Sequence, residues 1–149
     1  MNRRTPQEVK VNIVVGYLPS REGSAALDHA MSLAKRDGSR LIVVNTGRHG
    51  DNADPSFASS QDLDAIEAEL TEAGLDHEVR QVTTPISAAE AIIQTVAEVD
   101  ADLVVIGLRR RRPVGKLITG STAQAVLLDA SCPVLAVKPG QQPLPRLPL

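Results

Sequence analysis

The stretch ADLVVIGLRRRRPVGKLITGSTAQAVLLDA, residues 101–130, contains an apolar run, a loop with glycines and arginines, and a segment of helical character, in that order. The run LVVIG (103–107) is short and β-branched, which is typical of a strand buried on both faces of a parallel sheet. The segment STAQAVLLDA (121–130) predicts a helix, and PVLAV (133–137) predicts another buried strand. A strand, a crossover helix and a second strand form the repeating unit of α/β folds.

The same alternation extends over the rest of the chain. Apolar residues at helical spacing, followed by Gly38 or Gly74, predict two helices, and the capping-box spacing of Ser87 and Glu90 predicts the start of another. Turn-forming residues predict a long loop over 45–59. The predicted strands are 11–15, 41–44, 77–82, 103–107 and 133–137, and the predicted helices lie within 24–38, 60–74, 87–99 and 121–130.

This order of elements predicts an α/β fold with an open, doubly wound, parallel five-stranded sheet and helices on both faces. The strands at 11–15, 41–44 and 103–107 are the most apolar, so we expect them at the centre of the sheet. The strand at 77–82 mixes apolar and charged residues, which favours an edge. The resulting strand order is 3-2-1-4-5, in which ligands bind beyond the carboxyl ends of strands one and four.

Length and composition favour one domain without a membrane segment. The chain has 149 residues, 42% of them hydrophobic, and no apolar run approaches the roughly 18 residues that cross a bilayer. We expect a folded domain over 11–138, a flexible N-terminal tail over 1–10 and a Pro-rich flexible tail over 139–149. Cys132 is the only cysteine, which fits a reducing compartment, so we expect a cytoplasmic protein.

The sequence argues against several classes of site. Three histidines, His29, His49 and His77, show no metal-ligand spacing, and no nucleophile motif is present, so we predict neither a metal site nor a catalytic residue. The net charge of −2 argues against nucleic acid as a partner, and the only aromatic residues, Tyr17 and Phe57, offer little for base stacking.

The start of the last predicted helix is the best candidate for an anion site. Gly120 and Ser121 stand where free backbone N–H groups and the helix dipole favour a phosphate. The Ser121 hydroxyl either caps the helix or donates to that phosphate. Gly107 either lets a purine or ribose approach the backbone or allows a tight exit from the strand. The arginines 109–112 either pair with phosphate oxygens or form a solvated loop.

Over residues 11–138 the chain resembles the universal stress proteins. The segments that carry the resemblance are IVVGYLPSREGSAALDHA, LIVVN, DADLVVIG and GSTAQAVLLDASCPVLAVKP. Nucleotide-binding members of that family show glycine, two residues, glycine, nine residues, glycine, and then Ser or Thr. Gly107, Gly120 and Ser121 match the first, third and last of these positions, whereas the middle one is Arg110.

The resemblance implies an adenine nucleotide, ATP with Mg²⁺ as the accompanying ion, and a set of contact residues. Those residues are Gly107, Gly120, Ser121 and Thr122, with Thr46 near the adenine and Arg109 and Arg110 near the phosphates. It also implies a homodimer that pairs the fifth strands, Val134 to Lys138.

Two positions leave other functions open. Leu18 stands where ATP-binding relatives have an Asp that holds the ribose hydroxyls, and Arg110 replaces a glycine. The first hypothesis is a nucleotide-binding stress-response module that acts through its conformation or its partners. The second is a nucleotide-independent dimeric interaction protein with a degenerate ATP site. The third is a slow ATPase.

Overall fold

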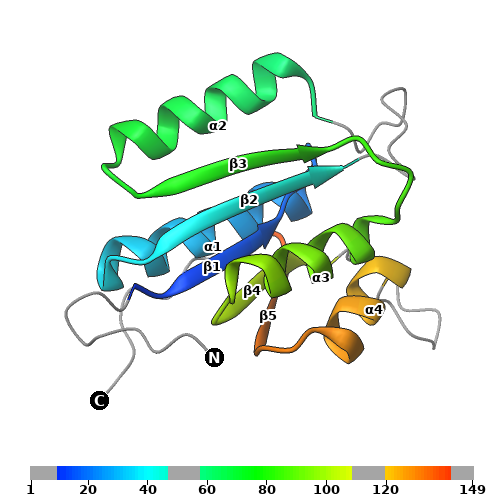
Figure 1. The fold of residues 1–149 in the computed structure, drawn as a ribbon. Helices are drawn as coiled ribbons and strands as arrows, with labels where there is room; N and C mark the ends of the chain where they lie inside the picture. The colour runs from blue at the N-terminus through cyan, green and yellow to red at the C-terminus, as the bar shows by residue number, and fades with distance from the viewer. Residues whose placement is uncertain (1–9, 47–57, 109–119, 142–149) are drawn as a thin grey trace.

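A computed structural model describes residues 10–46, 58–108 and 120–141, in which strands and helices alternate along the chain (Figure 1). The elements are β1 (Asn12–Gly16), α1 (Arg21–Asp37), β2 (Arg40–Thr46), α2 (Ser60–Glu72), β3 (His77–Val82), α3 (Ala88–Val99), β4 (Leu103–Gly107), α4 (Ser121–Asp129) and β5 (Val134–Val137).

The strands form one parallel sheet in the order β3-β2-β1-β4-β5, as the sequence predicted. The three central strands, β1, β2 and β4, are buried over most of their length, whereas every residue of β3 is partly exposed. The apolar runs therefore occupy the centre, because both of their faces are covered by helices.

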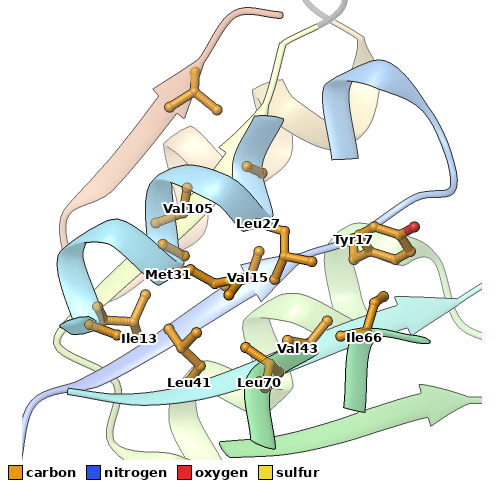
Figure 2. Packing of buried hydrophobic residues seen from close by; sticks show 14 of the residues in the cluster. Ile13, Val15, Tyr17, Leu27, Met31, Leu41, Val43, Ile66, Leu70 and Val105 are labelled. Atoms are coloured by element: carbon orange, nitrogen blue, oxygen red, sulfur yellow. The ribbon is translucent and has the colours of Figure 1, made fainter. Parts of the chain in front are cut away.

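Successive residues of each central strand point to opposite faces of the sheet, so the fold has two hydrophobic cores. On one face, Ile13 and Val15 of β1 pack with residues of α1 and α2. Figure 2 shows this side, with Leu27 and Met31 of α1 close to Val15. On the other face, Val14 packs with residues of α3 and α4. Two helices on each face confirm the predicted double winding.

Local capping explains where the helices begin and end. The hydroxyls of Ser20, Ser59 and Ser87 each accept a hydrogen bond from a backbone N–H in the first turn of the helix that follows. Gly38 ends α1 in the left-handed conformation, with φ of 68°, as its position in the sequence predicted. Asp100 ends α3 in the same region, with φ of 53°, which the sequence did not indicate.

Two predicted boundaries are wrong. The helix expected within 24–38 begins at Arg21, because Ser20 caps it. Asn45 and Thr46 were expected to open the long loop, but they are the last residues of β2. The strand continues because Asn45 pairs in register with Gln81 and Thr46 pairs with Val82 of β3. Residues 47–57 of that predicted loop lie outside the described residues, as do 1–9 and 142–149 of the two predicted tails.

The two edges of the sheet differ in charge. At the β3 edge, Glu78 and Arg80 form an ion pair with each other, Arg40 contacts Glu78 at 3.2 Å, and Arg80 reaches Glu98 of α3 at 2.7 Å. Hydrogen bonds from Arg80 and Arg40 lower the pKa of the Glu78 carboxyl below its usual value despite partial burial. At the opposite edge, β5 has the apolar sequence VLAV.

Candidate functional site

The carboxyl ends of the strands and the start of α4 lie at one end of the sheet, called the carboxyl edge below to distinguish it from the edge strands β3 and β5 (Figure 1). All five strands run in parallel, so each strand ends at this edge and each following helix begins there. The edge therefore brings together Thr46 at the end of β2, Gly107 at the end of β4, and Gly120, Ser121 and Thr122 at the start of α4. These are the predicted ligand contacts that fall within the described residues.

The N-terminus of α4 presents backbone donors without a capping side chain. The N-cap residue is Gly120, with extended φ and ψ of −69° and 163°, and no side chain of the described residues caps the helix with a hydrogen bond. The first hydrogen bond along the helix is donated by the N–H of Gln124 to the Gly120 carbonyl at 3.0 Å. The N–H groups of residues 121–123 precede that bond and point out of the helix end, where an anion is favoured.

Ser121 is the first residue of α4 and not its cap, so the capping interpretation of this serine is wrong. Its side chain and that of Thr122 are exposed. The reason is a shift of one residue: Gly120 takes the extended conformation that a cap requires, and Ser121 is already helical. Donation from the Ser121 hydroxyl to a phosphate stays a prediction.

The two glycines at this edge have different surroundings. A Cβ added to Gly107 would lie 2.2 Å from the carbonyl oxygen and 2.6 Å from the carbonyl carbon of Glu22, in the first turn of α1. A Cβ added to Gly120 would have no atom within 4 Å among the described residues. Gly107 therefore serves the close packing of β4 on α1, which supports its interpretation as a tight strand exit, whereas no described residue lies close to the Cβ position of Gly120.

The loop from β1 to α1 is held by backbone hydrogen bonds. The N–H of Tyr17 donates to the carbonyl of Val44 at 2.9 Å, and the N–H of Ser20 donates to the carbonyl of Leu18 at 2.8 Å. Leu18 is partly buried in this loop. Its side chain has no hydrogen-bonding atom, so it cannot hold a ribose hydroxyl.

A buried polar network fixes the ends of β1, β2 and β3, and the sequence did not reveal it. The fully buried amide of Asn45 donates to the Tyr17 carbonyl at 2.9 Å and accepts from the N–H of Ala58 at 2.9 Å. Gln81 donates to Asn45 at 3.0 Å and to the Ala58 carbonyl at 2.8 Å. The only signal is one polar residue directly after the apolar run LIVV. These hydrogen bonds fix the chain at the carboxyl ends of β1, β2 and β3.

Thr46, expected near an adenine, has its hydroxyl turned toward β3. The hydroxyl donates to the carbonyl of Val82 at 3.0 Å, and the residue is buried. A contact between Thr46 and a ligand stays a prediction. Arg109 and Arg110 lie outside the described residues.

Two other features are absent from the described residues. Across residues 10–46, 58–108 and 120–141, no three His, Cys, Asp or Glu side chains are grouped so that they could hold a metal ion. Within the same residues, no helix has both the length and the apolar character needed to cross a bilayer.

Comparison with known proteins identifies the family. The family model described as the universal stress protein family matches residues 11–138. The chain belongs to this family. A universal stress protein of Mycolicibacterium smegmatis is 42% identical over 127 residues, which cover 85% of this chain and 97% of the relative.

Solved structures of the universal stress protein family share the fold. One from Archaeoglobus fulgidus superposes with a TM-score of 0.69 at 28% identity, covering 86% of this chain and 98% of its own. A second from the same organism, solved in complex with dAMP, gives a TM-score of 0.57 at 23% identity and covers 86% of this chain and 97% of its own. The sheet order and the helices on both faces are thus those of universal stress proteins.

Proposed function

We propose that this universal stress protein binds an adenine nucleotide, ATP, at the carboxyl edge of its sheet and acts in the stress response through its conformation or its partners. The observation that carries the proposal is the open N-terminus of α4. Gly120 has no described atom within 4 Å of its Cβ position, and the exposed Ser121 and Thr122 follow it. Unpaired N–H groups at a helix start are a ready site for phosphate.

Each described residue has a separate task in this proposal. The N–H groups that begin α4 bind phosphate oxygens, and the Ser121 hydroxyl donates a further hydrogen bond. Because Gly107 has no side chain, the end of β4 can pack closely against the first turn of α1. The sequence places Arg109 and Arg110 near the phosphates as additional donors. Mg²⁺, when bound with ATP, offsets part of the phosphate charge.

The fit to ATP is good at the phosphate end and poor at the ribose end. Leu18 cannot accept hydrogen bonds from the ribose hydroxyls, and an unpaired hydroxyl costs about 1–3 kcal/mol, or roughly tenfold to a hundredfold in affinity. Structures with this fold have been solved with dAMP, with AMP and with cAMP. Those complexes support an adenine nucleotide as the ligand class.

We propose regulation by binding and not ATP hydrolysis, because α4 has no carboxylate near its N-terminus. Asp129 is the only carboxylate of α4, and it is the last residue of the helix, at the end away from Ser121. Hydrolysis needs a base or a water-orienting group close to the phosphates.

We also propose that the protein is a homodimer joined through β5 and the adjoining Lys138. β5 is an edge strand with an apolar sequence, and such an edge pairs readily with another chain. Leu127 and Leu128 of α4, the helix that precedes β5, are 45% and 76% exposed, so a second copy would cover apolar surface there.

Titration calorimetry with ATP, with and without Mg²⁺, tests nucleotide binding. Gly120→Asp introduces a negative charge beside the proposed phosphates, yet Asp is a preferred N-cap residue, so the fold should be kept. Gly120→Asn is the matched control, because it adds a cap of the same shape without the charge. We expect one site per wild-type chain, and we expect Gly120→Asp to bind at least tenfold more weakly than Gly120→Asn. Equal affinities of the two variants would place the phosphates elsewhere.

The partly buried Leu18 favours a second candidate, a dimeric interaction protein that needs no nucleotide. In that case wild-type protein that is folded and dimeric gives no heat with ATP up to about 1 mM, the concentration at which even a weak site would begin to fill. Purified protein that carries stoichiometric nucleotide through gel filtration would exclude this candidate.

A further inference from the structure

His77 joins the edge strand β3 to helix α2 through both nitrogens of its ring. Nε2 contacts a carboxylate oxygen of Glu67 at 2.5 Å, and Nδ1 contacts the backbone carbonyl of Leu75 at 2.8 Å. The His77 side chain is 13% exposed, so its ring is largely shielded from water. We call His77, the Glu67 carboxylate and the Leu75 carbonyl the His77 clasp.

The two partners of His77 require a doubly protonated ring. A carbonyl oxygen and a carboxylate oxygen are both hydrogen-bond acceptors. A neutral imidazole has one N–H and can satisfy only one of them, whereas the imidazolium has two and satisfies both. When the ring loses a proton, one of the two hydrogen bonds is lost, and so is the attraction between opposite charges in the pair with Glu67. The clasp is therefore complete only in the protonated state.

Charged groups near His77 come from three parts of the fold. Glu67 lies on α2, and Asp76 directly precedes β3. Asp76 is itself paired with Lys10 at 3.1 Å and with Arg40 of β2 at 3.7 Å. The backbone hydrogen bond of the clasp is the largest cause of a raised pKa of His77, and the carboxylates of Glu67 and Asp76 add to it against the opposing effect of burial. The folded protein therefore favours the protonated ring.

The remaining packing of α2 on the sheet is limited. Two of its thirteen residues, Ile66 and Leu70, are buried, whereas α1 buries seven of seventeen. Figure 2 shows these two side chains beside Val43 of β2. The start of α2 is held separately, because the N–H of Ala58 donates to the side chain of Asn45 at 2.9 Å. Loss of the clasp therefore weakens the attachment of the second half of α2 more than that of its start.

We propose that the His77 clasp is a pH-sensitive switch, which holds the second half of α2 on the sheet while the ring is protonated and lets it open more readily when the ring is neutral. Opening exposes the apolar side chains of Ile66 and Leu70. The stabilisation by the clasp is complete below the unfolded-state pKa of about 6.5 and is lost as the pH rises through the higher folded-state pKa. The proposal does not depend on nucleotide binding at α4.

Native-state hydrogen exchange, corrected for the intrinsic pH dependence of amide exchange, tests this opening. We expect the amides of residues 67–72 to exchange through a local opening that low concentrations of urea do not change. Its population should rise about twofold to fivefold between about pH 6 and pH 8.5, as expected for the loss of one partly exposed charge pair, and this rise should be absent in His77→Gln. Exchange of these amides only together with those of α1, or a local opening that does not respond to pH, would overturn the proposal.

Nuclear magnetic resonance of the His77 ring nitrogens tests the clasp itself. We expect both nitrogens to be protonated at about pH 6, and Glu67→Gln should lower the titration midpoint by about 0.3–0.7 pH units, which equals a twofold to fivefold loss of proton affinity. Asp64→Asn is the matched control, because it removes an exposed carboxylate from the same helix and leaves the pair with Glu67 intact. An unchanged midpoint in Glu67→Gln, or equal shifts in the two variants, would contradict the role of Glu67.

Discussion

Gly107→Ala should destabilise the protein, although it adds a single methyl group. The added Cβ would lie 2.2 Å from the carbonyl oxygen of Glu22, whereas ordinary contact begins at 3.4 Å, so the start of α1 has to retreat by about 1.2 Å. Overpacking of this kind costs about 1–3 kcal/mol, and the stiffer unfolded chain of the alanine variant returns about 0.4–1 kcal/mol. We expect a net loss of about 1–2 kcal/mol.

Thermal unfolding followed by far-ultraviolet circular dichroism measures this loss. For a chain of this size, 1 kcal/mol corresponds to about 2–4 °C, so the unfolding midpoint should fall by about 2–8 °C. Gly120→Ala is the matched control, because no described atom lies within 4 Å of its Cβ position and its φ is an ordinary −69°, and its midpoint should change by less than about 2 °C. Equal midpoints for wild type and Gly107→Ala would refute the close packing of β4 against α1.

Three further predictions concern other residues. Leu18→Asp should strengthen ATP binding about tenfold in calorimetry if the ribose lies beside this loop, and an unchanged affinity would argue against that position. Asn45→Leu should lower the free energy of unfolding, measured in urea, by about 2–4 kcal/mol, because the N–H of Ala58 and the carbonyl of Tyr17 lose their buried partners. A loss below about 1 kcal/mol would contradict the hydrogen bonds assigned to Asn45. The hydrogen bond to the carbonyl of Leu75, and then that to Glu67, raise the pKa of His77 above 6.5. The protonated His77 side chain therefore stabilises the fold fully below about pH 6.5, and this stabilisation is lost as the pH rises through the folded-state pKa. His77→Gln should therefore destabilise the protein more at about pH 5.5 than at about pH 8.5, and the reverse order in urea unfolding would be inconsistent with this pairing.

The strand order could be predicted from the sequence because each central strand is a short apolar run and two of the helices are followed by a glycine, Gly38 or Gly74. The run LVVIG and the stop at Gly38 are local signals, and the rules for parallel sheets then limit the topology. The end of β2 could not be placed, because Asn45 and Thr46 remain in the strand only through pairing with β3. That pairing joins residues that are far apart in the sequence.

The candidate site was predictable in position but not in detail. The glycine and serine at 120–121 indicated an anion site at a helix start, yet adjacent small residues do not show which of them is the cap. The need for glycine at position 107 arises from Glu22, a residue in a different element, and periodicity carries no information on such a contact.

The difference between the two sheet edges limits how many chains can assemble. If two copies join through their β5 strands, both outer edges of the shared sheet are β3 strands, which carry Glu78 and Arg80 and their ion pairs. Charged edge strands resist the addition of another strand, because pairing would force those charges together or out of water. In the proposed dimer, growth would then stop at the pair, and the joined sheet would not extend into a fibre.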